Sequence, residues 1–393
     1  MNMFSLRTNW PSEKNPLMSL LEDLKAQKVK IFDLTESNPT RAGFRYPARQ
    51  ILRPLFKSQN LLYHPEPLGN IKARETVAKM YQRQGISIDP SQVMLTASSS
   101  EAYSFLFRLL LNPGDAVLFP SPSYPLFDFL TQLNDAQMDF YSLGYEDQWK
   151  INKEAFQCVV TGKTKAVTLV SPNNPTGCFI KAEELKFVNE ACRKNDMAII
   201  CDEVFLDYVF AEQKGEAKSL AGNKEVLTFT LGGLSKSLGL PQMKVSWTIV
   251  NGPAEQVQEA LKRLEIIADT YLSVNTPCQN ALGDWLMFKD KIQKQIKVRI
   301  EKNKKALGAF CQKAPLNLLH SDGGWYGILE LPSGACEETW ALDLLQKHHV
   351  FVHPGYFFDF SQGAHIILSY LTPENIFREG LECLGKYSLS KQC

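Results

Sequence analysis

The sequence predicts an α/β protein with a mostly parallel sheet in a large three-layer αβα domain, together with a smaller α+β domain. The first observation is a set of short runs rich in β-branched residues, namely 116–119, 166–170, 197–201, 226–230 and 244–250. Most of these runs are apolar on both faces, as strands covered by helices on both sides require. The second observation is the amphipathic segments between them, such as 98–111 and 182–194, which produce a strand–helix alternation.

The third observation is that proline and glycine cluster where the apolar runs end, at 112–115, 120–122 and 172–177. These clusters predict turns at strand ends. Because open α/β sheets bind ligands beyond the carboxyl ends of their strands, the turns are where we look for a functional site.

After about residue 280 the pattern changes to a basic helical stretch at 289–305, strands at 325–331 and 350–352, and a last helix at 373–385. We therefore predict a large domain over 46–280 and a small domain made from 1–45 with 281–393. Apolar residues interrupt the lysines of 289–305, so we interpret this stretch as a solvated amphipathic helix rather than a nucleic-acid-binding patch.

The composition excludes several classes of protein. Forty-three Lys and Arg against 42 Asp and Glu give a net charge of +1, which provides no general attraction for nucleic acid or an anionic membrane. No apolar run approaches the roughly 20 residues that cross a bilayer. The start lacks a secretory pattern, and nine cysteines without CxxC spacing indicate reduced thiols rather than disulfides or a metal site. We expect a cytoplasmic protein without a metal.

Two motifs at strand ends or helix starts carry polar groups for a ligand. Ser98, Ser99 and Ser100 begin a long predicted helix, where hydroxyls and free N–H groups favour a phosphate, although a serine-rich start is often only a helix cap. Asn174 precedes Pro-Thr-Gly after a buried strand. Its carboxamide either contacts a ligand at the rim of the sheet or belongs only to a tight turn.

Two further motifs carry ionisable groups. Asp202 closes the predicted strand 197–201, where a buried carboxylate is costly unless a cation or hydrogen bonds meet it; the alternative is a cap for the next segment. Lys236 lies in a loop of small and apolar residues, an environment that lowers the pKa of an amine and makes it a nucleophile toward a carbonyl. The alternative is an ordinary solvated lysine.

The order and spacing of these motifs resemble the fold-type I, pyridoxal-phosphate-dependent aminotransferases of class I and II. Asp202 follows Asn174 by 28 positions and Lys236 follows Asp202 by 34 (202−174 and 236−202). The resemblance extends over nearly the whole chain, from 34–39 to 365–370.

The resemblance implies roles for individual residues in binding pyridoxal 5′-phosphate. Lys236 would bond covalently to the cofactor aldehyde and later move a proton, and Asp202 would pair with the pyridine nitrogen. Asn174 would donate a hydrogen bond to the phenolic oxygen of the ring. Tyr124 matches the aromatic residue that stacks on the ring, unless it is an ordinary turn residue, so the catalytic set is Lys236, Asp202 and Tyr124.

The resemblance also implies a phosphate site and a dimer. The phosphate would be held by Ser98, Ser99, Ser100, Ser235 and Lys244. Tyr63 matches a tyrosine that reaches the phosphate of the neighbouring subunit, which implies a homodimer with shared sites.

Three positions depart from the family pattern. Lys244 stands where an arginine usually meets the phosphate, so the charge is kept and the bidentate fork is lost. Phe205 stands where a tyrosine usually donates to the phenolic oxygen, a donor that is lost unless Tyr208 or water replaces it. Ile367 stands where an arginine usually clamps the substrate α-carboxylate.

The missing arginine leaves the recognition of the substrate open. Our hypothesis is that Arg41 or Arg45, in the segment with Ser37 that matches a substrate-lining loop, meets the carboxylate; the alternative is that both arginines are surface residues. Tyr356 lies in a segment that matches the part of the small domain that closes over substrate. Its aromatic neighbours suggest an apolar pocket or an ordinary core cluster.

The sequence therefore predicts a cytoplasmic, homodimeric aminotransferase that moves an amino group from an amino acid to a 2-oxo acid by a ping-pong mechanism. A lyase or decarboxylase with the same cofactor is one alternative, because the loss of arginine at Ile367 changes how a carboxylate is held. A non-catalytic binding or regulatory protein is another. A nucleotide-dependent oxidoreductase would need a GxGxxG motif, which the chain lacks.

Overall fold

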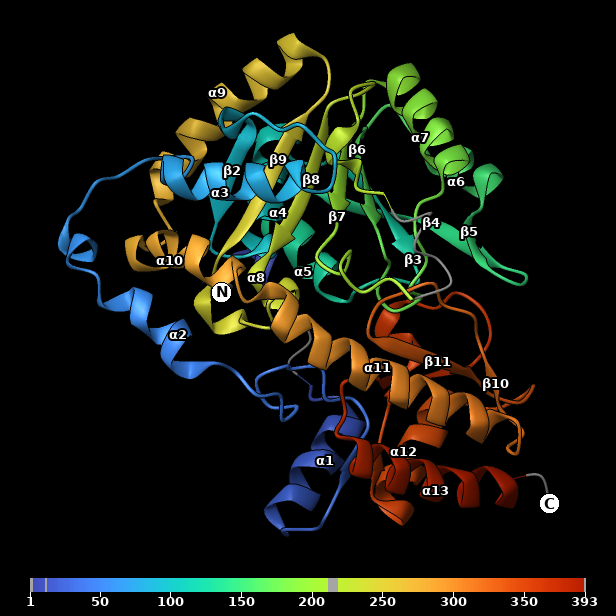
Figure 1. Ribbon diagram of the computed structural model, residues 1–393. Coiled ribbons are helices and arrows are strands. Elements are labelled where there is room, and N and C mark those ends of the chain that lie inside the picture. The colour runs from blue at the N-terminus through green and yellow to red at the C-terminus, as the bar shows by residue number, and fades with distance from the viewer. Residues whose placement is uncertain (1–2, 11–12, 211–217, 392–393) are drawn as a thin grey trace.

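The computed structural model describes residues 3–10, 13–210 and 218–391. Its central feature is an eight-stranded sheet with the strand order β2-β9-β8-β7-β6-β3-β4-β5 (Figure 1). The strands are β2 (Val93–Thr96), β3 (Ala116–Ser121), β4 (Gln137–Tyr145), β5 (Trp149–Ile151), β6 (Thr164–Val170), β7 (Ala198–Asp202), β8 (Thr228–Gly233) and β9 (Ser246–Asn251). All five predicted runs are strands of this sheet.

Five neighbouring strands, β4, β3, β6, β7 and β8, are parallel, so the predicted fold class is confirmed. β9 differs from that expectation because it is antiparallel to both β8 and β2. The connection from β8 to β9 holds only α8 (Leu234–Ser237) and a 3₁₀ turn (Pro241–Met243). Without a long crossover the chain returns beside β8 in the opposite direction.

Helices cover both faces of the large sheet and complete three layers. One face packs against α4 (Ser99–Leu110), α5 (Leu126–Leu133) and α9 (Ala254–Tyr271), the other against α3 (Ile71–Gln82), α6 (Lys153–Val159) and α7 (Ala182–Asn195). Successive residues of a strand enter different cores: Ile200 packs on the α4 side and Ile199 on the α7 side. This explains why the strands are apolar on both faces.

A second, antiparallel sheet is built from the C-terminal part of the chain, in the order β10-β11-β14-β13. Its strands are β10 (Asn317–Leu318), β11 (Tyr326–Glu330), β13 (His353–Pro354) and β14 (His365–Ser369). β1 (Phe32–Asp33) pairs with β12 (Val350–Phe351), so a segment near the N-terminus joins this part of the protein. Around these strands lie α1 (Pro16–Ala26), α12 (Glu337–His348) and α13 (Glu374–Ser390) (Figure 1).

The remaining helices are α2 (Ala48–Leu52), α10 (Thr276–Leu286) and α11 (Lys289–Cys311). α11 runs from the large sheet to the second one (Figure 1). Its Ile292, Ile296 and Ile300 are buried, which confirms an amphipathic helix.

The turn after β3 is tied to the second sheet's region. The backbone N–H of Ser123 donates to the carbonyl oxygen of Phe358 at 2.8 Å, and Ser121 Oγ donates to the carbonyl oxygen of Asp359 at 2.6 Å. These contacts place the carboxyl edge of the large sheet against the short 3₁₀ helix Gly355–Phe358. Among the described residues, no helix has the length and apolar character that a membrane span requires.

Candidate active site

The predicted site residues follow strands that end at one edge of the large sheet. Tyr124 follows β3, Asn174 follows β6, Asp202 is the last residue of β7, and Lys236 follows β8. The negative charge of Asp202 shifts the pKa values of both Lys236 and Tyr124, so these side chains share one electrostatic environment. The structure therefore brings together residues from four separate strand ends in the crevice where such sheets bind ligands.

The backbone of Lys236 is held rigidly. A Cβ at Gly233 would lie 2.4 Å from Ser246 Oγ, so glycine is required where β8 and β9 meet just before α8. The hydroxyl of Tyr208 donates a hydrogen bond to the backbone carbonyl oxygen of Lys236 at 2.7 Å. Together these contacts fix the position from which the lysine side chain extends.

The amine of Lys236 lies among aromatic rings. Its Nζ is 5.3 Å from the ring centroid of Phe205 and 5.0 Å from that of Trp325. Burial lowers the pKa of Lys236 to about 8, although the charge of Asp202 acts in the opposite direction. At neutral pH a larger fraction of this amine is uncharged than in a solvated lysine, as a nucleophile toward a carbonyl requires.

Asp202 is a buried carboxylate with few partners. Its Oδ1 accepts from the backbone N–H of Val204 at 3.0 Å, and its Oδ2 accepts from the hydroxyl of Tyr103 at 3.4 Å. Burial raises the pKa of Asp202 to about 6, so the group is still ionised at neutral pH. Asp202 and Lys236 influence each other but form no direct ion pair.

The two asparagines of the turn after β6 have different tasks. Asn173 Oδ1 accepts from the N–H and the hydroxyl of Thr176, at 3.3 and 3.0 Å, and so stabilises the turn. Asn174 Oδ1 is buried without a hydrogen-bond partner among the described residues. Because Asn173 holds the turn, the carboxamide of Asn174 is left for a ligand.

Tyr124 is 44% exposed and packs edge to face on Phe127, with ring centroids 6.2 Å apart. Burial and the charge of Asp202 raise the pKa of Tyr124. Its ring thus lies near the buried carboxylate while part of the side chain remains exposed.

The residues predicted to hold a phosphate lie at the start of α4. Ser98 Oγ accepts from the N–H of Glu101 at 3.1 Å, so Ser98 is the helix cap that the alternative interpretation describes. The N–H groups of Ser99 and Ser100 are in the first turn, which offers them no acceptor within the helix. Such groups and the helix dipole favour an anion at this end.

The two other predicted phosphate residues lie on the connection between β8 and β9. Ser235 is partly buried in α8, one residue before Lys236. Lys244 is exposed and has a left-handed backbone with a φ of 51°. Because Ser246 pairs with Thr96, this connection ends close to the start of α4.

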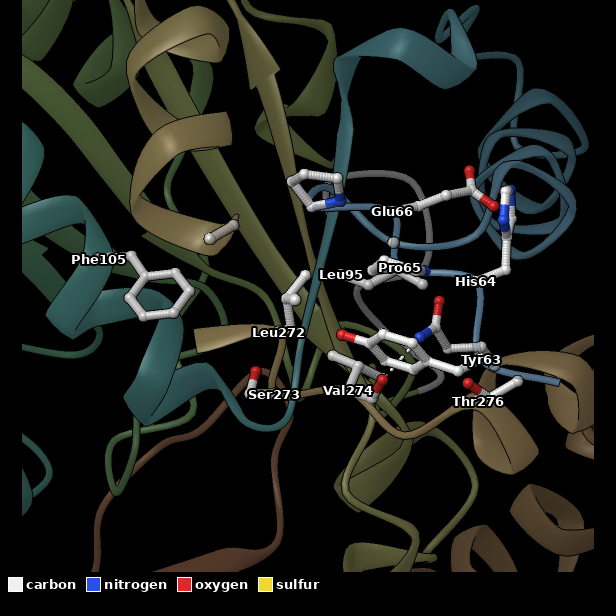
Figure 2. Close-up of a pocket in the computed structure, with 14 residues that line it drawn as sticks. Tyr63, His64, Pro65, Glu66, Leu95, Phe105, Leu272, Ser273, Val274 and Thr276 are labelled. Carbon is white, nitrogen blue, oxygen red and sulfur yellow. Dashed lines mark hydrogen bonds between the residues drawn. The ribbon is translucent and has the colours of Figure 1, made fainter. Parts of the chain in front are cut away.

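Tyr63 lies away from this crevice, on the surface. It is 78% exposed and lines a pocket with Val274 and Thr276, and its ring lies beside these two residues in Figure 2. Within the single chain it makes no contact with Lys236 that the structure records. This position fits the prediction that Tyr63 acts on a neighbouring subunit, which the single chain does not test.

The four predicted substrate residues are placed differently. Burial raises the pKa of Tyr326, and the neighbouring hydroxyl of Ser37 acts in the opposite direction. The side chain of Arg41 is 77% exposed, 3.9 Å from Glu36 Oε2, and Arg45 is exposed as well, as the surface interpretation predicts. Tyr356 lies on the Gly355–Phe358 turn, and its hydroxyl accepts from Asn15 Nδ2 at 3.1 Å.

The structure clarifies two departures from the family pattern. The hydroxyl of Tyr208 is engaged by the Lys236 backbone, so Tyr208 does not replace the donor that is missing at Phe205. Ile367 is buried in β14, opposite Ile328 and His353 in the neighbouring strands.

Sequence reasoning missed three residues of the site. Trp325 lies over the lysine amine, Tyr103 donates to Asp202, and Asn173 holds the turn. The only signal for Trp325 was an aromatic residue after two glycines, and Tyr103 is one of several apolar-face residues of a helix. Neither pattern points to a site until the fold brings it there.

The fold and the site define an α/β protein with a lysine of lowered pKa and a buried carboxylate at the carboxyl edge of a mostly parallel sheet. The chain belongs to the family described as aminotransferase class I and II, whose profile matches residues 30–378. It is an aminotransferase, and the lyase or decarboxylase alternative is not favoured.

Named relatives agree with this family. The glutamate-pyruvate aminotransferase AlaA of Haemophilus influenzae is 26% identical over 373 residues, covering 93% of this chain and 92% of that protein. The alanine aminotransferase of Mycobacterium tuberculosis H37Rv is 26% identical over 397 residues, covering 96% and 90%.

Solved structures show the same fold. An alanine aminotransferase from Pyrococcus furiosus superposes with a TM-score of 0.89 at 23% identity, over 98% of this chain and all of that one (100%). An aspartate aminotransferase from Thermotoga maritima has a TM-score of 0.83 at 24% identity, over 98% and 99%.

The family uses pyridoxal 5′-phosphate, and the residues present here fit that group. The carboxamide of Asn174, whose buried oxygen has no partner among the described residues, the buried carboxylate of Asp202 and the Lys236 amine of lowered pKa follow or end neighbouring strands at one edge of the sheet. The amide N–H groups of Asn174 can donate to a phenolic oxygen, the carboxylate can accept from a protonated pyridine nitrogen, and the amine can bond to an aldehyde.

Proposed function

We propose that this protein uses pyridoxal 5′-phosphate to transfer an amino group from an amino donor to a 2-oxo acid in two half-reactions of a ping-pong mechanism. One observation carries the proposal. Asp202 ends β7 and Lys236 follows β8, the parallel strand that pairs directly with β7 and places Leu231 opposite Asp202, and the two side chains form no ion pair. Such a pair holds a nucleophilic amine and a carboxylate ready on either side of a small aromatic ring.

Each residue has a physical task in this proposal. The bound cofactor supplies an electron sink for the bond that breaks at the substrate Cα. Asp202, ionised above about pH 6, keeps a proton on the pyridine nitrogen. The Nζ of Lys236 binds the cofactor at rest and carries the proton that leaves Cα. Asn174 orients the ring through its carboxamide, and Tyr124 covers one ring face.

The phosphate end is assigned to the first turn of α4 with Ser98, Ser99 and Ser100, helped by Ser235 and Lys244. Free N–H groups at the helix start supply directional donors. Lys244 adds positive charge without the fork of an arginine, so we expect its removal to weaken cofactor binding moderately.

We also propose the domain division and the assembly. Residues 46–280 would bind the cofactor, and 1–45 with 281–393 would close over it; the pairing of β1 with β12 supports this grouping. The exposed ring of Tyr63 supports a homodimer in which each subunit completes the other's phosphate site. A small-molecule reaction of this kind suits the cytoplasm.

Covalent capture tests the cofactor assignment. Protein loaded with pyridoxal phosphate should be yellow, and borohydride should fix the cofactor on the peptide that contains Lys236, as measured by mass spectrometry. Lys289→Ala is the matched control, because it removes a lysine that pairs with Asp207 on the turn after β7 and should leave the label on Lys236. A colourless loaded protein, or a label on another lysine, would contradict the proposal.

Subunit complementation tests the shared site. Lys236→Ala and Tyr63→Ala should each have little activity, whereas a mixture allowed to exchange subunits should recover about a quarter of the wild-type activity. Half of the random dimers would be mixed, and each would contain one intact site. If the mixture stays as inactive as its components, Tyr63 does not act across an interface.

The substrates are tested by half-reactions. Because the relatives are named for alanine, glutamate and pyruvate, L-alanine and L-glutamate are the first donors to mix with the loaded protein. Arg41→Ala and Arg45→Ala then test the carboxylate hypothesis: a raised KM in either variant supports it, and two unchanged values remove it.

A further inference from the structure

We propose that the indole N–H of Trp325 donates a hydrogen bond to the phenolic oxygen of bound pyridoxal phosphate. This inference rests on the proposed function and adds a residue to its cofactor site. It follows from a buried donor without a partner, from the position of the Trp325 ring beside Lys236, and from the tasks of the neighbouring side chains.

Trp325 carries a polar atom that the fold leaves unpaired. Its side chain is fully buried, and its Nε1 has no hydrogen-bond partner among the described residues. The buried indole of Trp247, by contrast, donates to Tyr81 Oη at 3.2 Å. That of Trp285 donates to the carbonyl oxygen of Ile51 at 2.8 Å. Because an unpaired buried donor is destabilising, the N–H of Trp325 requires an acceptor that the chain itself does not supply.

The ring of Trp325 lies at the atom to which the cofactor would bond. Its centroid is 5.0 Å from Lys236 Nζ, and it packs edge to face on Phe205 with centroids 5.2 Å apart. In pyridoxal phosphate the phenolic oxygen stands on the ring carbon next to the one that carries the aldehyde. Of the acceptors on the cofactor, this oxygen is therefore the one closest to Lys236 Nζ, over which Trp325 lies.

The backbone at Trp325 is tied to that of Lys236 through Tyr208. The carbonyl oxygen of Tyr208 accepts from the N–H of Gly324 at 2.8 Å, and its hydroxyl donates to the carbonyl oxygen of Lys236 at 2.7 Å. The rings of Tyr208 and Trp325 also pack edge to face, with centroids 5.0 Å apart. The carbonyl oxygen of Trp325 accepts from the N–H of Tyr370 at 2.7 Å. The indole thus has a fixed position relative to the lysine, as a directional donor requires.

A second unpaired polar atom lies on the turn that packs against this segment. A Cβ at Gly177 would lie 2.3 Å from the carbonyl oxygen of Gly323, so the two turns are in contact. Asn174 belongs to the same turn as Gly177, and its buried Oδ1 has no partner among the described residues. Buried polar atoms without partners therefore occur on two adjoining segments beside Lys236, which favours a polar ligand between the segments and the lysine.

The neighbouring side chains leave this task to Trp325. The hydroxyl of Tyr208 is already bonded to the backbone of Lys236, and Phe205, whose ring packs on Trp325, has no donor. Trp325 would therefore share the phenolic oxygen with the carboxamide of Asn174. Because a donor stabilises an ionised oxygen, the contact lowers the pH at which the bound cofactor loses its phenolic proton.

Removing the N–H while keeping an aromatic ring tests the inference. Trp325→Phe is loaded with pyridoxal phosphate, and its visible absorption band is followed as the pH is varied. We expect the midpoint of this titration to rise by about one pH unit or more, the effect of losing a hydrogen bond to a charged group. The ionisable groups Asp202, Lys236 and Tyr124 are the same in variant and wild type. An unchanged midpoint in a folded, loaded variant overturns the inference.

Trp149→Phe is the matched control. The indole nitrogen of Trp149 is also buried without a partner among the described residues, but its ring packs on Tyr145 and Phe360 at the edge strand β5. This variant should keep the wild-type midpoint. An equal rise in both variants overturns the inference, because the loss of any buried indole would then produce it.

A cofactor analogue gives a readout that does not depend on activity. 3-Deoxypyridoxal phosphate lacks only the phenolic oxygen, and its dissociation constant is compared with that of pyridoxal phosphate by equilibrium dialysis. Trp325→Phe should weaken the binding of pyridoxal phosphate by about tenfold and change the binding of the analogue by less than about twofold. Equal weakening for both ligands overturns the inference, since Trp325 would then act only through its packing.

The wild-type protein keeps the inference testable if Trp325→Phe does not fold. With tryptophan labelled at the indole nitrogen, the six indole N–H groups give separate NMR signals, and Trp→Phe variants at the other positions leave the signal of Trp325 to be assigned by elimination. Pyridoxal phosphate should move this signal downfield, as a new hydrogen bond does, and the analogue should not. If the analogue moves it as far, the inference is wrong.

The outcomes separate this inference from the function on which it rests. If borohydride labels Lys236 but Trp325→Phe changes neither the titration nor the comparison with the analogue, the proposed function stands and the inference is wrong. If Trp325→Phe changes only the KM of an amino donor, the indole meets the substrate instead, and the inference is again wrong. If no cofactor is captured on Lys236, both are wrong.

Discussion

Replacing Asp202 by asparagine should stabilise the cofactor-free protein at pH 8 while removing most of its activity. The carboxylate is buried at the end of β7, and burial raises its pKa from 3.8 to about 6. Because the folded-state pKa lies above the unfolded one, ionisation opposes folding. The contribution of this group to stability is greatest below about pH 4 and is lost as the pH rises through 6.

The magnitude follows from the pKa difference. A shift of 2.2 units (6−3.8) corresponds to about 3 kcal/mol of lost stability at pH 8 and to about 0.5 kcal/mol at pH 4. Asparagine has the same shape without the charge, and its oxygen can still accept from the N–H of Val204. The variant should therefore gain about 3 kcal/mol at pH 8 and little at pH 4.

Urea unfolding of the cofactor-free protein at the two pH values measures this gain. Asp207→Asn is the control, because Asp207 Oδ1 pairs with Lys289 Nζ at 2.7 Å on the following turn and its loss should cost up to about 1 kcal/mol. Transaminase activity of Asp202→Asn should fall about 100-fold or more, since nothing then holds the pyridine proton. The reasoning is refuted if Asp202→Asn gains no stability at pH 8, or gains as much at pH 4.

Three other measurements test the residues around Lys236. The rate at which the cofactor-free protein binds pyridoxal phosphate covalently should rise with pH around a midpoint near 8, the pKa of Lys236. Asp202→Asn should lower that midpoint, because the charge of Asp202 raises the pKa of Lys236, and a wild-type midpoint near 10 would contradict the burial of the amine. Tyr208→Phe should lower the free energy of unfolding in urea by about 1–2 kcal/mol, because it leaves the buried carbonyl oxygen of Lys236 with one donor fewer. A loss below roughly 0.3 kcal/mol, which is no larger than the error of such comparisons, would show that water replaces the hydroxyl. Gly233→Ala should lower the free energy of unfolding by about 1–3 kcal/mol, because its Cβ would lie 2.4 Å from Ser246 Oγ on β9. Gly308→Ala, within α11 where a Cβ meets no atom within 4 Å, should raise it by about 0.5–1 kcal/mol. Equal effects of the two variants would refute the steric argument.

Much of the fold was predictable because its signals are local. Continuous apolar runs separated by amphipathic helices indicate covered strands, and all five predicted runs are strands. The antiparallel direction of β9 was not predictable from its composition, since a strand buried on both faces has the same apolar pattern in either direction. The short connection that holds Lys236 decided the direction.

Asn174, Asp202 and Lys236 were predicted as site residues from motifs at the ends of predicted strands and from their spacing, and in the structure each ends or closely follows a strand of the same sheet. The sequence by itself determined which functional groups follow the strands of that sheet. It also showed that Phe205 and Ile367 depart from the family pattern. These properties belong to single positions and to regular periods, so they can be read along the chain.

Only the tertiary structure showed what surrounds those groups. It placed Trp325 over the amine of Lys236, 89 positions earlier in the sequence (325−236), and committed the hydroxyl of Tyr208 to the lysine backbone. It also assigned the turn to Asn173 and left the amide of its neighbour without a partner. Burial and electrostatic coupling depend on segments that are distant in sequence, and only folding brings those segments into contact.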